Sequence, residues 1–229
     1  MMRHSNLPDP QNRLVVFCDF DGTVSRRDIG YHFFHHFSGG KIQKLIPDWK
    51  AGVMSSREIL TREAEMSTVH QEEVEPFLEQ FEISPGFVDF VTLCEQNHVP
   101  VHIISDGLDI YITWLLKRYQ LERLPVMSNT ATLDSGRITL QFPFDNGACE
   151  RCGNCKGERI RQYRQSHPGT NVVFVGDGMS DLCAIDEADI LFAKKDLENY
   201  CQANNIDYVP YHHFPDVARW LLARGYLQK

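Results

Sequence analysis

The sequence predicts an α/β fold in which helices cover both faces of a doubly wound parallel sheet. Apolar segments of strand length alternate along the chain with stretches whose apolar residues recur at helical spacing. Three of the strand-like segments end in polar, glycine-containing turns at residues 19–23, 105–107 and 176–178. The carboxyl ends of parallel strands share one edge of a sheet, so we expect these turns to border one ligand crevice.

The first strand is expected at residues 14–18, where the apolar sequence LVVFC runs directly into Asp19. Residues 26–82 lack strand-like alternation, and their apolar residues recur at helical spacing. We therefore expect a small helical cap at 26–82, inserted after the first strand. The core would then consist of residues 1–25 and 83–229.

The second part of the core continues the alternation of helices and strands. A helix is expected next, with Ser84 as its N-cap and Pro85 at its first position. A strand at residues 100–104 and another helix follow. The remaining elements are expected as β structure over 126–144 with a turn at 134–136, a helix from Lys156, a strand at 171–175, a helix over 180–187, a strand at 190–193, and further helix–strand–helix elements.

Composition and charge restrict the class of partner. The chain has 229 residues, of which 42% are hydrophobic, enough for one domain with an inserted module. A net charge of −8 argues against nucleic-acid and membrane-surface partners, which require a basic face. Residues 1–12 are polar, without the apolar region of a signal peptide, and no apolar run reaches membrane-spanning length. We therefore expect a cytoplasmic protein.

The polar residues at the expected sheet edge fit phosphoryl transfer. One carboxylate can attack phosphorus to give an aspartyl phosphate, while a second acid protonates the leaving oxygen and then activates water. Mg²⁺ takes oxygen ligands, and a lysine and a hydroxyl can meet the charge of the phosphoryl oxygens. The edge would carry such a set: Asp19, Asp21, Ser105, Lys156, Asp177 and Asp181.

These residues lie in four segments that resemble, in the same order, the motifs of the haloacid-dehalogenase-like hydrolase superfamily. The resemblance covers nearly the whole chain after the polar N-terminal residues and implies a Rossmann-like core. An aspartate at the position of Asp21 is typical of its phosphatases and phosphomutases, whereas its dehalogenases and P-type ATPases lack one. The segments are Asp19-Phe20-Asp21-Gly22-Thr23, Ser105, Lys156, and Gly176-Asp177-Gly178-Met179-Ser180-Asp181.

The resemblance also implies a role for each of these residues. Asp19 would be the nucleophile and Asp21 the general acid/base. Mg²⁺ would be bound by Asp19, the backbone carbonyl of Asp21, and Asp177. The phosphate-binding residues would be Ser105, Asp106, Gly107 and Lys156, and the supporting residues Thr23, Gly178 and Asp181. From the residues alone, Ser105 could instead cap the following helix, and Asp181 could complement a helix dipole.

The position of the cap bears on the substrate, which would be a small-molecule phosphate ester. A helical insertion between the first two motifs is typical of the subclass that includes phosphoserine phosphatase, where the cap closes over the substrate. Phosphoserine phosphatases carry an acidic residue for the substrate amine nine positions after the nucleophile, where this chain has Asp28. Asp28 could instead be the N-cap of the first cap helix.

A closer resemblance connects the chain to the methionine-salvage phosphatases, which act on 2-hydroxy-3-keto-5-methylthiopentenyl-1-phosphate. It rests on residues 105–109, 149–157 and 191–211, although the salvage enzymes carry glycine at the position of Asp106. The loop at 149–157 also resembles the phosphoethanolamine and phosphocholine phosphatases. These amine esters, phosphoserine, and transfer by a phosphomutase therefore stay open as alternatives to the salvage ester.

The seven cysteines are an odd number, and a disulfide framework is unlikely in a protein expected in the cytoplasm. Cys149, Cys152 and Cys155 form two successive Cys-x-x-Cys spacings, which suit zinc, but a closed zinc site needs four ligands. No fourth cysteine or histidine pair follows nearby, so we expect reduced thiols that shape the loop before Lys156. A non-enzymatic zinc or redox module is the remaining alternative. Three other cysteines are expected in the core: Cys18, Cys94 and Cys183.

Overall fold

A mainly parallel sheet forms the centre of the computed structural model, which describes residues 7–145, 149 and 151–229. Residues 1–6 of the expected tail and Glu150 of the cysteine loop lie outside the described residues. The strands lie in the order β4-β3-β2-β1-β5-β6-β7, and among them β3 and β4 pair antiparallel. The predicted α/β class is therefore confirmed. The strands are β1 (Leu14–Cys18), β2 (Val101–Leu108), β3 (Val126–Asp134), β4 (Arg137–Gln141), β5 (Asn171–Gly176), β6 (Ile190–Ala193) and β7 (Val209–Pro210).

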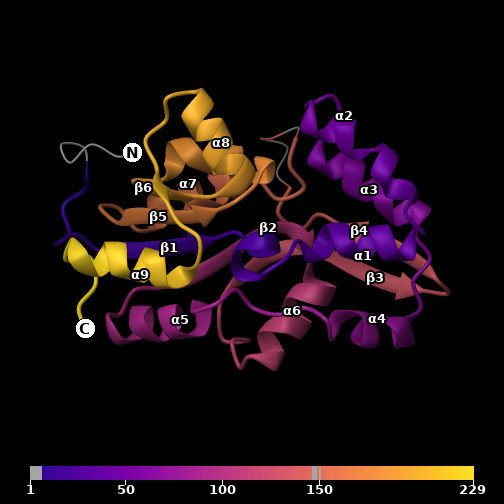
Figure 1. The fold of residues 1–229 in the computed structure, drawn as a ribbon, viewed down its shortest axis with the longest axis horizontal. Helices are drawn as coiled ribbons and strands as arrows, with labels where there is room; N and C mark the ends of the chain where they lie inside the picture. The colour runs from indigo at the N-terminus through magenta and orange to yellow at the C-terminus, as the bar shows by residue number, and fades with distance from the viewer. Residues whose placement is uncertain (1–6, 146–148, 150) are drawn as a thin grey trace.

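Helices cover both faces of the sheet, which explains why its central strand is apolar throughout. Every residue of β1 is buried, and successive side chains enter opposite core layers. Val16 and Cys18 pack on the side of α5 (Phe87–Gln96), α6 (Asp109–Arg118) and α9 (Phe214–Ala223) (Figure 1). Val15 and Phe17 pack on the side of α7 (Lys156–Ser166), the 3₁₀ helix η4 (Met179–Glu187) and α8 (Lys195–Ala203).

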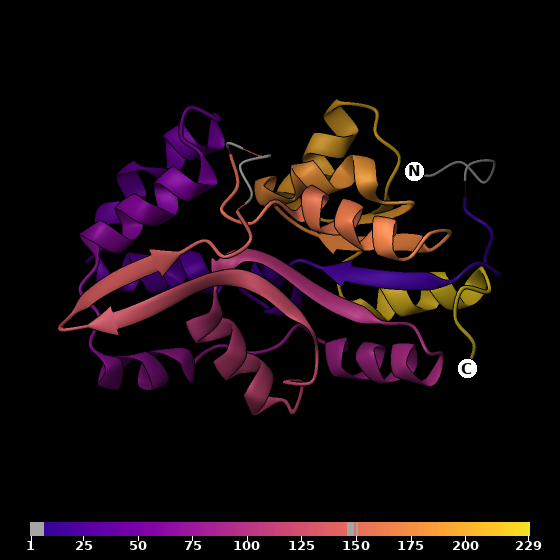
Figure 2. The same ribbon diagram turned by 180° about the vertical axis from the view of Figure 1, so that it is seen from behind.

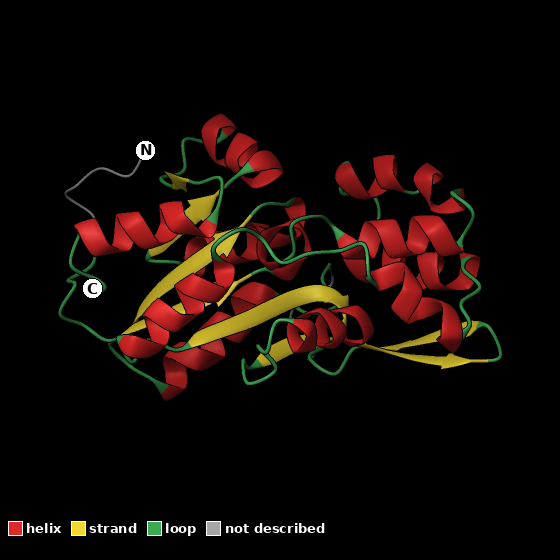
Figure 3. Cartoon of the chain, turned by 60° about the horizontal axis from the view of Figure 1, so that its bottom comes forward, coloured by secondary structure: helices red, strands yellow, loops and turns green. Residues whose placement is uncertain are grey.

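The segment between β1 and α5 is helical, and it lies to one side of the sheet (Figure 3). It leaves and re-enters the core through an antiparallel bridge between Ser25 and Ile83. This paired crossing supports our proposal of a cap at 26–82. The elements are α1 (Ile29–Phe37), η3 (Lys41–Lys44), α2 (Ile46–Lys50), α3 (Ser56–Met66) and α4 (Gln71–Leu78).

The β3–β4 hairpin reaches beneath α2 and α3 (Figure 2). The backbone N–H of Val69 donates to the carbonyl of Gly136 at 3.0 Å, which ties the end of α3 to the hairpin turn. The hairpin is thus a platform for the helices, although it lies far from them in sequence. None of the helices in the described part of the chain is long and apolar enough to cross a membrane.

Three local expectations were wrong. Helix α5 begins at Phe87 after a left-handed Gly86, because the Ser84 hydroxyl donates to the carbonyl of Thr23 at 2.6 Å instead of capping a helix. Strand β2 continues to Leu108 through an irregularity in its pairing, so Ser105 lies inside the strand. The helix expected over 180–187 is a 3₁₀ helix.

Candidate active site

The nucleophile candidate Asp19 lies at the carboxyl end of β1, buried below a tight turn formed by Phe20–Val24. Gly22 has a φ of +78°, and a Cβ there would collide with the Asp177 carboxylate. The turn therefore requires glycine for its conformation and for the close approach of the β5 loop. In this way the sequence after the first strand brings Asp19 and Asp177 together.

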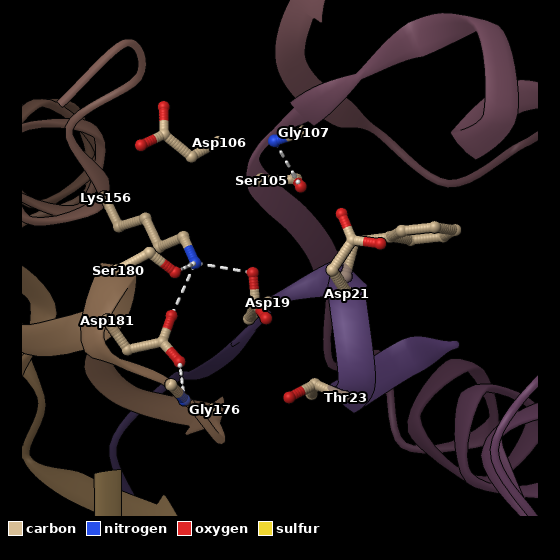
Figure 4. Close-up of polar contacts among 12 residues, drawn as sticks. Asp19, Asp21, Thr23, Ser105, Asp106, Gly107, Lys156, Gly176, Ser180 and Asp181 are labelled. Atoms are coloured by element: carbon tan, nitrogen blue, oxygen red, sulfur yellow. Dashed lines mark hydrogen bonds and ion pairs between the residues drawn. The ribbon is translucent and has the colours of Figure 1, made fainter. Parts of the chain in front are cut away.

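Lys156, the first residue of α7, is fully buried between two carboxylates (Figure 4). Its Nζ lies 2.5 Å from Asp19 Oδ1, 2.5 Å from Asp181 Oδ1 and 3.3 Å from Ser180 Oγ. Burial disfavours the charged ammonium, but Asp181 and Asp19 outweigh this effect and raise the pKa of Lys156 well above its ordinary value. The lysine therefore stays cationic at the position where a phosphoryl group would meet Asp19.

Asp181 is a positioning residue behind this group. Its Oδ2 accepts hydrogen bonds from the backbone N–H groups of Asp177 at 2.9 Å and Gly178 at 3.0 Å. These bonds fix the turn after β5, while Oδ1 pairs with Lys156. Asp181 therefore does more than complement a helix dipole, because it connects Lys156 to the turn after β5.

The carboxylates at this edge fit a divalent cation. Ligand oxygens of Asp19, Asp177 and Asp181 lie within 4.8 Å of one another. Asp177 Oδ2 also accepts from Lys195 Nζ at 2.7 Å, a contact that sequence reasoning missed. Lys195 lies within the 191–211 segment that resembles the salvage phosphatases, and this was the only signal for it.

Asp21 is held apart from this cluster by three hydrogen bonds. Oδ1 accepts from the N–H groups of Ile29 at 2.8 Å and Gly30 at 3.1 Å, and Oδ2 accepts from the Tyr111 hydroxyl at 2.9 Å. Burial, and next the negative charge of Asp28, raise the pKa of Asp21 to about 7 against the effect of these bonds. A carboxyl group with such a pKa can both donate and accept a proton near neutral pH.

Ser105 and Gly107 line the same cavity from β2. Ser105 Oγ accepts from the N–H of Gly107 at 2.9 Å, whereas α6 begins after Leu108, so Ser105 is not the cap of α6. A Cβ on Gly107 would collide with the Tyr111 hydroxyl and with Asp21. Glycine is therefore required where β2 passes the acid/base candidate.

Asp106 and Thr23 also support the site, and of the two only Asp106 lines the cavity. Asp106 Oδ1 accepts from the N–H of Asn154 at 2.8 Å and from Asn129 Nδ2 at 3.2 Å. This side chain therefore holds the loop that precedes Lys156. Thr23 is buried, with its Oγ1 3.5 Å from the Tyr211 hydroxyl, and does not line the cavity.

The cavity above these residues has a volume of about 740 Å³ and lies between the core and the helical segment. Asp28 is the N-cap of α1, where it accepts a hydrogen bond from the N–H of Tyr31 at 2.8 Å. It also lines the cavity, so both positions expected for it are compatible. The wall of the cavity that the helical segment forms is mostly apolar and aromatic. It includes Tyr31, Phe34, Ile46, Pro47, Trp49, Ile59 and Leu60.

Glu63 on α3 is a cavity residue that sequence reasoning missed. It is only 6% exposed, and its carboxylate has no hydrogen bond or ion pair among the residues that the structure describes. Burial, together with the negative charge of Asp28, raises the pKa of Glu63 to about 8. In the sequence it is one acidic residue of an amphipathic helix, so nothing distinguishes it from its exposed neighbours.

The cysteine loop lies next to Lys156. Cys183, which we expected in the apolar core, is instead half-buried in η4, and its Sγ lies 4.0 Å from Cys152 Sγ. Cys18 and Cys94 are buried as expected.

Together, the sheet and the acidic and basic residues at its edge have the arrangement that we expect of a phosphatase. The chain matches the model of the family described as Putative Phosphatase over residues 13–220, so it belongs to this family. This membership rules out the alternative of a non-enzymatic zinc or redox module.

Curated relatives support the same class. The chain is 27% identical over 208 residues to a 2-hydroxy-3-keto-5-methylthiopentenyl-1-phosphate phosphatase of Bacillus cereus, covering 89% of this chain and 94% of the relative. A protein of the same name from Brevibacillus brevis is 27% identical over 214 residues, with coverages of 91% and 95%.

Solved structures share the fold. A HAD family hydrolase of Salmonella enterica superposes with a TM-score of 0.73 at 20% identity, covering 97% of this chain and 73% of that one. A phosphoserine phosphatase carrying an analogue of its phospho-aspartyl intermediate superposes with a TM-score of 0.71 at 16% identity, with coverages of 92% and 99%.

Proposed function

We propose that this phosphatase hydrolyses a small phosphomonoester through an aspartyl phosphate on Asp19. The observation that carries the proposal is the division of the two aspartates. The Asp19 carboxylate lies beside the Lys156 ammonium, whereas the Asp21 carboxyl is held apart by hydrogen bonds from Ile29, Gly30 and Tyr111. One acid is therefore available for attack and the other for proton transfer.

Each step follows from these positions. An Asp19 oxygen attacks phosphorus, the bond to the leaving oxygen breaks, and that oxygen takes the proton of Asp21. Water then attacks the phosphorus of the aspartyl phosphate and gives a proton to Asp21, which restores both residues and releases phosphate. Lys156, the Ser105 hydroxyl and nearby N–H groups meet the charge on the phosphoryl oxygens.

A divalent cation fits the carboxylate cluster, and Mg²⁺ is the proposed ion because hard oxygen ligands suit it. Asp19, Asp177 and the carbonyl of Asp21 would hold it. When bound, it supplies positive charge that reduces repulsion between Asp19 and the phosphate group.

For the substrate, we propose first the methionine-salvage ester, 2-hydroxy-3-keto-5-methylthiopentenyl-1-phosphate. The names of the relatives and the apolar wall of the cavity support it, because a methylthio tail is apolar. The wall includes Tyr31, Phe34 and Ile59.

One observation favours a second candidate, an ester with a cationic amine such as phosphoethanolamine or phosphocholine. Asp28 and Glu63 both face the cavity, and Glu63 has no cationic partner among the described residues. The lysines that line the cavity are already paired, Lys50 with Asp196 and Lys195 with Asp177. A substrate carboxylate is therefore less well matched, which disfavours phosphoserine.

A phosphate-release screen with Mg²⁺ over the salvage ester, phosphoethanolamine, phosphocholine and phosphoserine tests this proposal. We expect free phosphate, with the highest kcat/KM on the salvage ester, and background rates for Asp19→Asn. An isomerised ester without free phosphate would indicate a phosphomutase, and full activity in Asp19→Asn would contradict the mechanism.

A further inference from the structure

Four cysteines from two segments of the chain gather beside Lys156. The Sγ atoms of Cys149, Cys152 and Cys155 lie within 4.8 Å of one another, and Cys183 Sγ of η4 lies 4.0 Å from Cys152 Sγ. We propose that these four thiols bind one zinc ion as a structural site. The fourth ligand that the sequence lacks near the loop is supplied by the fold, 28 residues beyond Cys155 in the chain.

The distances suit a tetrahedral zinc site. Zinc binds thiolate sulfur at about 2.3 Å, which places the sulfurs of a tetrahedron about 3.8 Å apart. The Sγ atoms of Cys152 and Cys183, 4.0 Å apart, are already near this spacing. The three loop sulfurs lie within 4.8 Å of one another, and the loop would tighten around the ion on binding. All four residues carry free thiols, and sulfur ligands select zinc over Mg²⁺. The cluster is therefore chemically distinct from the carboxylate site.

The two segments that carry the cysteines pack closely together. A Cβ on Gly157 would collide with the carbonyl of Cys183, so the start of α7 and η4 are in direct backbone contact.

A buried arginine without an ion pair among the described residues provides a second, independent observation. Arg159 lies one helical turn after Cys155 and is buried, and its Nε and Nη2 have no hydrogen-bond partner among the described residues. Zinc with four thiolates carries a net negative charge. The Arg159 guanidinium lies over the Phe144 ring, 5.6 Å from its centroid. An aromatic ring does not neutralise the buried charge, whereas an anionic zinc–thiolate group would.

Zinc at this position would cross-link the two segments that hold the phosphoryl-binding lysine. Lys156 directly follows Cys155, and its partner Asp181 precedes Cys183 by two residues. The four cysteines are thus positioning residues with no contact to the substrate. On binding, each thiol releases its proton to solvent and zinc stays divalent, so no oxidant is needed.

The test is the metal content of the full-length protein, purified under reducing conditions without a chelator. We expect one zinc per chain by elemental mass spectrometry. After exchange to Co²⁺, we expect the thiolate charge-transfer band and the strong d–d bands of tetrahedral sulfur coordination. Neither readout depends on phosphatase activity or on the proposed substrate.

Variants locate the ion. Cys183→Ser should weaken zinc binding at least about tenfold, whereas Cys94→Ala removes a distant buried thiol and should keep one zinc. Asp177→Asn should also keep it, because the carboxylate site is separate. Wild-type protein without zinc and without the Co²⁺ thiolate band would overturn the proposal, as would full zinc retention in Cys183→Ser or a Cys152–Cys183 disulfide in the reduced preparation. If Cys183→Ser does not fold, the wild-type Co²⁺ spectrum decides.

Discussion

At the scale of single residues, the site depends on side chains that the motifs do not contain. The sequence placed Asp19, Lys156 and Asp177 at one sheet edge, because parallel strands end together. Tyr111 and Glu63 could not be found, since each acts through a contact between segments far apart in the chain. Their roles follow from burial and from hydrogen bonds that only the folded chain brings together.

Tyr111→Phe tests whether Tyr111 tunes the acid/base group. Its hydroxyl donates to Asp21 and thereby lowers the pKa of Asp21, so its loss should raise that pKa above about 7. We expect the limb of the pH–rate profile that belongs to Asp21 to move to higher pH, and kcat at neutral pH to change about tenfold. A profile that keeps its position would exclude this role.

Glu63→Gln tests the buried carboxyl group of the cavity wall through stability. Folding raises its pKa to about 8, so between about pH 4.5 and pH 8 the folded state holds a proton that the unfolded state releases. Wild-type stability should therefore fall as the pH rises through this window, at about 1.4 kcal/mol per pH unit in the steepest part. Denaturant unfolding at pH 5 and pH 8 measures it.

Glu63→Gln has no titratable group at this position. The variant should therefore be more stable than the wild type at pH 8 and similar to it at pH 5. An equal difference between the two proteins at both pH values would contradict the assignment. If a cationic amine is the natural ligand, the same variant should also raise KM for phosphoethanolamine and leave KM for the salvage ester unchanged.

At the scale of elements, apolar runs of strand length predicted the strands well, and local capping signals predicted the ends of elements poorly. The β3–β4 hairpin followed from its turn at 134–136. The start of α5 was misplaced because the Ser84 hydroxyl binds the carbonyl of Thr23, 61 residues away. A capping preference is weak, and a buried backbone acceptor from another segment can override it.

Gly22→Ala tests the turn that brings β1 and β5 together. The substitution adds the strain of a φ of +78° and a collision with Asp177, so we expect a loss of about 1 kcal/mol in stability and at least tenfold in kcat/KM. Gly169→Ala is the matched control, because it has a φ of +77° and open space around its Cβ position. It should lose stability from strain alone, less than Gly22→Ala loses, and keep its activity. Equal activity losses in both variants would show that strain alone is responsible.

At the scale of the whole molecule, the cavity exists only where the helical segment meets the core. The sequence predicted an insertion at 26–82 but not the shape of the cavity, because helical periodicity does not specify how α2 and α3 lie over the sheet. One contact across the cavity mouth is the ion pair between Lys50 of α2 and Asp196 of α8, at 3.0 Å.

Charge reversal tests this contact. Both side chains are about half exposed, so the pair should contribute little, and salt should screen it. Lys50→Glu should raise KM about threefold at low salt, and the double variant Lys50→Glu/Asp196→Lys should restore it. No rescue in the double variant would mean that the pair does not hold the segments together.

The covalent intermediate on Asp19 is the central claim, and rapid acid quenching tests it directly. The measurement uses the variant Asp21→Asn with an aryl phosphate as substrate. An aryl oxide leaves without an acid, so the first step proceeds. The second step lacks its base, so the phosphorylated enzyme should accumulate. Mass spectrometry should find one phosphoryl group on the peptide that contains Asp19, and none in Asp19→Asn/Asp21→Asn. Turnover of the substrate with no phosphorylated peptide, or with the group on another residue, would contradict the account.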